Sequence, residues 1–231
     1  MLTPVMAAAA GAASLGCCVF GFLYMKDYKD HRYGRSFWTK AAAAVCFILA
    51  GVCLMGACAR RDFARLVVAG LVMGLCGDQI LAIRFHVPHN RSLYFGAGAI
   101  AFSIGHFFYM KALFGLVGLR LEYLVPVLVL GAGAAYLYGR HHRTNAGKLQ
   151  AAGVVYILWV ILMAAFSISA FLAAPGPGTL LFALGGLCFG CSDNILFAYS
   201  FGIYRRWSMN IAVHVTYYAA QLLIAWSIPL I

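Results

Sequence analysis

Two aspartates lie inside long apolar stretches of the sequence, and their surroundings match. Residues 74–81 read Gly-Leu-Cys-Gly-Asp-Gln-Ile-Leu, and residues 189–196 read Phe-Gly-Cys-Ser-Asp-Asn-Ile-Leu. Inserting such a carboxylate into hydrocarbon costs on the order of 2–3 kcal/mol, and it almost always faces the interior of a helix bundle. If Asp78 and Asp193 share one site, a protonated and an ionised carboxyl group together form a general acid–base pair. The same groups also move protons in coupled transporters.

Further polar residues recur beside the aspartates and in the apolar runs that follow them. His106-x-x-Tyr109 lies in the run after Asp78, and His214-x-x-Tyr217 lies in the run after Asp193. Residues one helical turn apart share a face, so each His–Tyr pair is expected to point the same way. Purely structural roles are the alternative: the aspartates would hydrogen-bond helices together, and each His would donate to a nearby carboxylate or carbonyl. The candidate supporting residues are Gln79, His106, Tyr109, Ser192, Asn194, His214, Tyr217 and Gln221.

The elements that must position these residues are membrane-spanning helices. The 231 residues are 64% hydrophobic and 10% charged, whereas soluble domains carry about 25% charged residues. Runs of about 20 apolar residues recur with short polar breaks, which predicts an all-α integral membrane protein with about eight transmembrane helices in a single domain, 1–231. The predicted spans are Pro4–Met25, Phe37–Cys58, Ala64–Arg84, Ser92–Leu113, Leu121–Tyr138, Leu149–Leu172, Gly178–Phe201 and Ser208–Leu230.

The basic residues indicate how these spans are oriented. Lys and Arg number 17 against 6 Asp and Glu, and they gather in the polar breaks, with Lys40 counted in the first break and Asp27 assigned to it. This pattern fits topology and contact with anionic headgroups, so no nucleic-acid partner is expected. The odd-numbered breaks carry more Lys and Arg than the even ones, which predicts a multi-pass protein with both termini non-cytoplasmic. Asp78 and Asp193 would then lie about 10 Å inside the cytoplasmic ends of their spans.

The matching motifs also suggest an internal repeat. Two halves, 1–118 and 119–231, would each contain four spans of like orientation, which gives a parallel repeat about an axis along the membrane normal. Gly70 and Gly74 share a helix face with Asp78, and Gly186 and Gly190 lie near Asp193 in the same way. Such small residues let helices approach closely.

Neither a metal nor another cofactor is expected. The chain has 8 cysteines, all in apolar runs, where free Cys behaves as a small hydrophobic residue. Cys188-x-x-Cys191 has a metal or redox spacing, but no second pair or His ligand lies nearby in the sequence.

Four motifs, taken in order, resemble the YhhN family of membrane proteins, which includes the lysoplasmalogenases. They are Gly77-Asp78, Gly105-His106-Phe-Phe-Tyr109, Ser192-Asp193, and the segment from Tyr217 through Ala220-Gln221 to Leu223-Ile224. The resemblance covers residues 64–231. It implies an eight-span fold, hydrolysis of the vinyl ether bond of a lysoplasmalogen to a fatty aldehyde and a glycerophospho-headgroup, and Asp78 and Asp193 as the catalytic pair.

Several questions remain open at this point. Asp193 is favoured as the acid, since Ser192 and His214 can tune it. Arg84, Arg205 and Arg206 are candidate contacts for the phosphate of a lysophospholipid, or else serve topology alone. A proton-coupled transporter using the same aspartates is the alternative function, and an ester or amide lysolipid is the alternative substrate. The oligomeric state is left undetermined.

Overall fold

A computed structural model describes residues 2–231 and is all-helical over that range. It contains eight helices long and apolar enough to cross a membrane, as the hydropathy pattern predicts. The protein is therefore a multi-pass helical membrane protein. The helices are α1 (Pro4–Lys29), α2 (Tyr33–Met55), α3 (Arg61–Ile83), α4 (Arg91–Val117), α5 (Leu121–His141), α6 (Gln150–Ala173), α7 (Pro177–Phe201) and α8 (Trp207–Ser227).

Several helices are longer than the apolar runs that predicted them. α1 continues to Lys29 and α2 already begins at Tyr33, so that the first polar break shrinks to a short turn. The assignment of Asp27 and Lys40 to that break was wrong. Asp27 is buried on α1 and Lys40 is buried inside α2. The reason is physical: hydropathy marks where the chain meets lipid, whereas charged residues continue a helix readily once it leaves the hydrocarbon.

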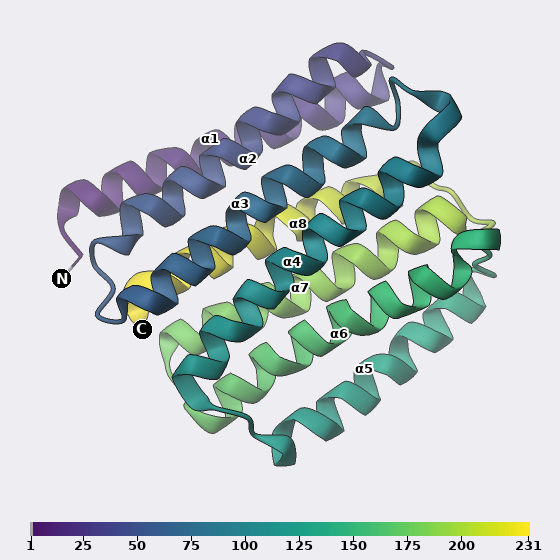
Figure 1. Cartoon of the computed structure of the whole chain (residues 1–231). Coiled ribbons are helices and arrows are strands. Elements are labelled where there is room, and N and C mark those ends of the chain that lie inside the picture. Colours follow the sequence, from purple (N-terminus) through teal and green to yellow (C-terminus); the bar gives the residue numbers. More distant parts are fainter. Residues whose placement is uncertain (1) are drawn as a thin grey trace.

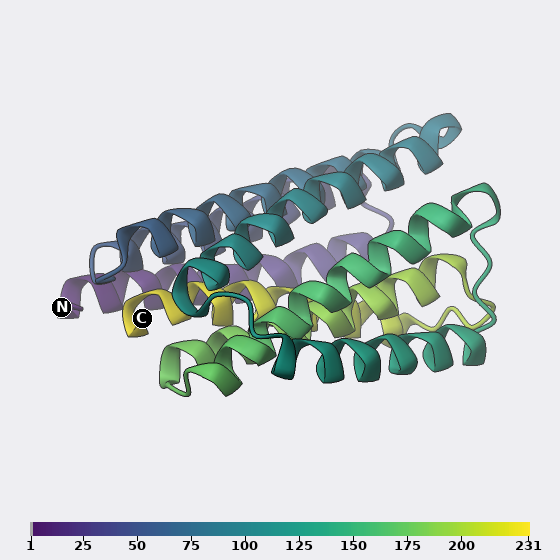
Figure 2. The same cartoon turned by 60° about the horizontal axis from the view of Figure 1, so that its bottom comes forward.

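The helices run roughly alongside one another, and both chain termini lie at the same end of the bundle (Figure 1). Helix α8 packs against α1, α2, α3 and α7, whereas α5 lies at the margin beside α6 (Figures 1 and 2). Helix α2 contacts α8, and α4 contacts α6, which are equivalent pairs if the two halves are repeats. The repeat and the side of the membrane on which the termini lie stay predictions.

Glycines allow α3 and α4 to approach each other. A side chain at Gly70 would run into the ring of Tyr109, and one at Gly77 would lie 2.8 Å from the ring of Phe102. A Cβ at Gly105 would lie 3.2 Å from the carbonyl oxygen of Gly70. Of the predicted small-residue face of α3, Gly70 thus lies against Tyr109 of α4, whereas Gly74 lies against Gln221 and Tyr217 of α8. These contacts fix the rotation of α3 and so the direction of Asp78.

We expect Gly70→Val to destabilise the protein, because the added side chain has no room beside Tyr109. Overpacking of this kind costs about 1–3 kcal/mol, so the apparent Tm in detergent should fall by several degrees. Gly115→Val on the same helix pair is the matched control, since a Cβ at Gly115 meets nothing within 4 Å. Equal Tm values for the two variants would contradict this account of the α3–α4 contact.

Candidate active site

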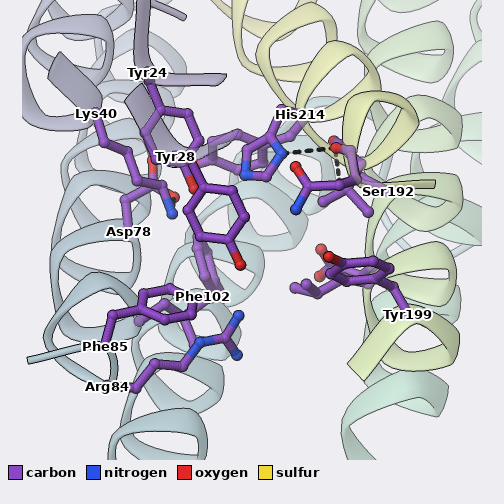
Figure 3. Close-up of a pocket in the computed structure, with 16 residues that line it drawn as sticks. Tyr24, Tyr28, Lys40, Asp78, Arg84, Phe85, Phe102, Ser192, Tyr199 and His214 are labelled. Atoms are coloured by element: carbon purple, nitrogen blue, oxygen red, sulfur yellow. Dashed lines mark hydrogen bonds and ion pairs between the residues drawn. The ribbon is translucent and has the colours of Figure 1, made fainter. Parts of the chain in front are cut away.

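A small cavity, lined largely by polar side chains, lies near the end of the bundle away from the termini, between α1, α2, α3, α4, α7 and α8. Its volume is about 40 Å³. Figure 3 shows Lys40 and Asp78 on one side, Ser192 and Tyr199 on the other, and Tyr28 between them. The polar residues that line the cavity are Tyr24, Tyr28, Lys40, Asp78, Arg84, Ser192, Asp193, Tyr199, Asn210, His214 and Tyr217. Both aspartates of the matching motifs therefore line one small cavity.

Asp78 forms a buried ion pair with Lys40. The Lys40 Nζ lies 2.9 Å from Asp78 Oδ1, and the two side chains are 7% and 3% exposed. The ammonium also lies 5.4 Å from the centroid of the Tyr24 ring, a cation–π contact. Two charges in such a place are tolerated because each is the counter-ion of the other. The pair therefore stabilises Asp78 as a carboxylate.

The sequence contained a signal for Lys40 that the charge count obscured. Lys40 lies inside the predicted span that begins at Phe37, yet it was counted with the topology-determining charges of the first break. A lysine within a span needs either a partner or a path for its ammonium group to the headgroup region. Here the side chain is 5% exposed and turns inward to Asp78.

Asp193 has a different kind of partner. The hydroxyl of Tyr156 on α6 donates a hydrogen bond to Asp193 Oδ2. Within residues 2–231, no Lys, Arg or His side chain forms an ion pair with Asp193. A buried carboxyl group without a counter-ion is most stable in its neutral form. Nothing in the sequence around Tyr156 distinguishes it from other tyrosines in spans, so this partner was not predicted.

The two aspartates are thus alike in sequence but unlike in environment. Lys40 lies on α2 and Tyr156 lies on α6, which are equivalent helices if the halves are repeats. The Lys40 ammonium therefore pairs with Asp78, whereas the neutral Tyr156 hydroxyl bonds to Asp193. The Lys40 ammonium favours the ionised form of Asp78, and the lack of a cation beside Asp193 within the described residues favours its neutral form.

A chain of hydrogen bonds connects the motif residues of α4 and α8. Tyr109 Oη donates to Gln221 Oε1 at 2.7 Å, and Gln221 Nε2 donates to Tyr217 Oη at 3.0 Å. Because Tyr217 accepts from Gln221, its own proton is free for another acceptor on the cavity side. Gly74 makes room for this chain, since a Cβ there would collide with the Gln221 amide.

His214 and Ser192 line the cavity, but their contacts differ from the expected tuning of Asp193. His214 Nδ1 is 2.8 Å from the carbonyl oxygen of Asn210, and its ring lies 4.8 Å from that of Tyr24. Ser192 Oγ donates to the carbonyl oxygen of Val213 at 2.9 Å, which ties α7 to α8. Tyr156 is the side chain that bonds to Asp193.

Five of the predicted supporting residues do not line the cavity: Tyr109 and Gln221, described above, and His106, Gln79 and Asn194. His106 is fully buried on α4, with its ring 4.5 Å from Phe189 and 6.4 Å from Tyr156. In the described part of the chain, neither of its ring nitrogens has a hydrogen-bond partner, and the same is true of the side-chain amide of Gln79. Asn194 Nδ2 bonds to the carbonyl oxygen of Gly190 at 2.8 Å and faces α5.

The three candidate arginines do not line the same cavity. Arg84 lines the cavity and also a second, outer cavity beside it, whereas Arg205 lines the outer one alone. Arg206 is exposed at the start of α8 and lines neither. Arg91, which was not a candidate, lies with Arg84 and Arg205 in the outer cavity.

Cysteine, histidine and carboxylate side chains of the described part of the chain are not gathered into a potential metal site. Within residues 2–231, no three such side chains are grouped so that they could hold a metal ion. Cys188 is half-buried and Cys191 is exposed on the outside of the bundle.

The fold and the cavity define a class: a polytopic membrane protein with two buried carboxyl groups facing one polar cavity. The YhhN family model matches residues 35–228. The chain therefore belongs to the YhhN family. Comparisons with curated proteins and with solved structures give no match.

Removing the Lys40 ammonium should strongly destabilise the protein. Lys40→Met leaves the Asp78 carboxylate buried without a counter-ion, and breaking a buried pair in this way costs about 3–5 kcal/mol. We expect a large drop in apparent Tm for Lys40→Met in detergent.

The double variant Lys40→Met/Asp78→Asn removes both charges and should recover most of the lost stability. The matched surface pair is Arg65 and Asp62, whose side chains are 69% and 91% exposed. The corresponding Arg65→Met should change the Tm little. Additive effects of the Lys40 and Asp78 substitutions would show that the two groups do not interact.

Proposed function

We propose that this protein is an intramembrane hydrolase of lysoplasmalogens, which cleaves their vinyl ether bond. Membership of the YhhN family, which is associated with lysoplasmalogenase activity, supports this function. The observation that carries the proposal is the unequal pair of buried carboxyl groups, Asp78 with Lys40 and Asp193 with Tyr156, at one cavity.

A vinyl ether is cleaved by adding a proton to carbon. Asp193 gives its proton to the carbon of the double bond farther from oxygen, and the electron pair of the double bond forms the new C–H bond. The carbon next to oxygen becomes part of an oxocarbenium ion. Glycoside hydrolases use two carboxyl groups in a similar way, because their transition states also have oxocarbenium character.

Water completes the reaction. It adds to the oxocarbenium carbon, and its released proton restores Asp193 to the acid form. The hemiacetal then breaks its bond to the glycerol oxygen, which leaves as an alcohol while the former vinyl carbon becomes an aldehyde. One water is consumed, and no redox change occurs.

The cavity is suited to that water. A volume of about 40 Å³ exceeds the 10–15 Å³ or so that one water needs, and polar side chains surround it. The Oδ2 atom of Asp78 is buried without a hydrogen-bond partner in the described residues. In the proposed site this oxygen accepts a hydrogen bond from the water once the side chains that cover it move, while Lys40 occupies Oδ1. The hydrogen bond orients the water, and Lys40 favours the ionised form of Asp78.

Tyr156 completes the assignment of roles. Its hydroxyl occupies Asp193 Oδ2, which leaves Oδ1 to carry the proton. When Asp193 has lost that proton, the Tyr156 hydrogen bond stabilises the new carboxylate, as does the positive charge of the oxocarbenium ion. Asp193 is therefore the proposed acid and Asp78 the group that orients water.

The first test measures the products of two substrates. Purified protein in detergent is incubated with a 1-alkenyl lysophospholipid and with its 1-acyl counterpart, and fatty aldehyde and free fatty acid are quantified. We expect aldehyde from the alkenyl lipid, and loss of at least 10²-fold in turnover for Asp78→Asn and Asp193→Asn, since each removes a group that takes part in proton transfer or water activation.

Asp62→Asn is the matched control, because this exposed carboxylate lies on α3 as Asp78 does. Its turnover should equal that of the unmodified protein. Fatty acid release from the acyl lipid instead of aldehyde release would identify an ester hydrolase. No turnover of either lipid by folded protein would overturn the hydrolase proposal and direct attention to proton-coupled transport in liposomes.

A second test addresses Tyr156. Tyr156→Phe removes the hydroxyl that bonds to Asp193 while keeping the ring beside His106. We expect kcat to fall about 10-fold or more, because a charge-assisted hydrogen bond to the developing carboxylate is lost. An unchanged kcat would show that this hydrogen bond plays no part in the chemical step.

A further inference from the structure

Three arginines surround a cavity that lies just outside the aspartate site. Arg84, Arg91 and Arg205 line this space of about 290 Å³, which is here called the arginine cavity. In residues 2–231, none of the three forms an ion pair with a carboxylate. Arg84 is held instead by aromatic rings, with its guanidinium 4.8 Å from Phe85 and 5.4 Å from Phe95. Three positive charges around one hollow without a counter-ion are complementary to an anion.

The loop that carries Arg205 is fixed in place. The backbone N–H of Asn145 donates to Phe201 at 3.0 Å, and that of Ile203 donates to His142 at 3.1 Å. These bonds connect the α7–α8 loop to the α5–α6 loop. Arg205 Nε also donates to the carbonyl oxygen of Gly202 at 3.3 Å. These hydrogen bonds hold Arg205 in place beside the arginine cavity.

An apolar groove continues from the arginine cavity into the membrane. It runs between α4 and α6 with a volume of about 400 Å³, and it shares Phe95, Leu149 and Phe201 with the arginine cavity. Trp159 closes its deep part, since the indole N–H donates to the carbonyl oxygen of Ser103 on α4 at 3.0 Å. From Leu149 to Trp159 the helix rises about 15 Å, half of the roughly 30 Å hydrocarbon core. The groove therefore has the depth of one leaflet.

The aspartate site touches both spaces. Four residues, Tyr28, Arg84, Phe85 and Tyr199, line the arginine cavity and the aspartate cavity alike. Tyr156 lines the apolar groove while its hydroxyl bonds to Asp193. The place where the arginine cavity meets the apolar groove is therefore next to Asp193, the proposed acid.

We propose that the arginine cavity and the α4–α6 groove together bind one single-chain glycerophospholipid, with its phosphate among Arg84, Arg91 and Arg205 and its chain along the groove. This inference rests on the proposed function and adds the position of the substrate. The bond between glycerol and chain lies where the three spaces meet. One groove, between α4 and α6, shares lining residues with the arginine cavity, and a single groove suits the single chain of a lysolipid.

The aspartate cavity, at about 40 Å³, is too small to admit part of a lipid. The bond to be cleaved therefore reaches Asp193 only when the four side chains that line both cavities move. Tyr28 and Phe85 are in edge contact, with ring centroids 5.2 Å apart. Their separation would open the aspartate cavity toward the bound lipid.

The test uses a ligand that cannot be hydrolysed. A saturated 1-alkyl lysophosphatidylcholine with brominated chain carbons lacks the double bond to be protonated, and bromine quenches nearby indole fluorescence. We titrate it into the full-length protein in detergent and follow the emission that disappears in Trp159→Phe. The expected result is saturable quenching of Trp159 that unlabelled lysolipid reverses.

Two matched pairs of variants locate the ligand. A Cβ at Gly96, which lines the groove, meets nothing within 4 Å, as is also true of Gly115 near the other end of α4. Gly96→Leu should weaken binding of long-chain probes about tenfold, whereas Gly115→Leu should not.

Arg205→Gln should raise the Kd of the probe about tenfold or more through a lost charge-assisted hydrogen bond, while the neighbouring Arg206→Gln should leave the Kd unchanged.

Other outcomes overturn the proposal. Quenching that does not saturate, or that is the same in Gly96→Leu and Gly115→Leu, would mean that the probe meets Trp159 from the bulk lipid. Glycerophosphocholine or inorganic phosphate competing as well as lysolipid would indicate an anion site without a tail groove. The probe undergoes no chemistry, so binding and hydrolysis are tested separately. Saturable binding without aldehyde release from the alkenyl lipid would reject the hydrolase and keep the lipid site. Aldehyde release without saturable binding of the probe would keep the hydrolase and reject the lipid site.

Discussion

The ion pair between Lys40 and Asp78 constrains the rest of the structure, because neither charge is tolerated alone at this depth. At 2.9 Å the two groups bring α2 and α3 together, and α8 packs on both helices, so that His214 and Tyr217 face the same space. A buried pair of this kind adds little net stability compared with an apolar pair of the same size. Its presence is better explained by what it holds in place, namely an ionised carboxylate inside a membrane protein.

A small cavity lined by polar side chains lies within a bundle of lipid-facing helices, and this arrangement separates the two solvents that the proposed hydrolase would need. Water is scarce in hydrocarbon, and a lipid tail is insoluble in water. Here the small aspartate cavity suits water, the α4–α6 groove suits an apolar chain, and Tyr156 lies at the boundary between them. The aromatic side chains of Tyr28, Phe85 and Tyr199 separate the cavity from the cationic outer space.

Similar sequence motifs hold two groups in different environments. Asp78 and Asp193 each follow a Cys by two residues and precede an Ile-Leu pair, yet a lysine approaches one and a tyrosine hydroxyl approaches the other. An acid and its complementary carboxylate require this difference. In two exactly equivalent halves both carboxyl groups would share one environment, and their protonation states would differ only through mutual repulsion.

The sequence by itself determined the number of helices, because backbone groups in lipid must bond within each span and 20 or so apolar residues are needed to cross. It also identified Asp78 and Asp193, since a carboxyl group inside such a run is too costly to be incidental. It did not reveal Lys40 or Tyr156 as partners, nor that Arg91 rather than Arg206 joins Arg84 and Arg205. Those contacts join helices far apart in the chain, and they depend on how each helix is rotated. That rotation is decided by the close packing of glycines such as Gly70 and Gly74 against α4 and α8, which only the tertiary structure specifies.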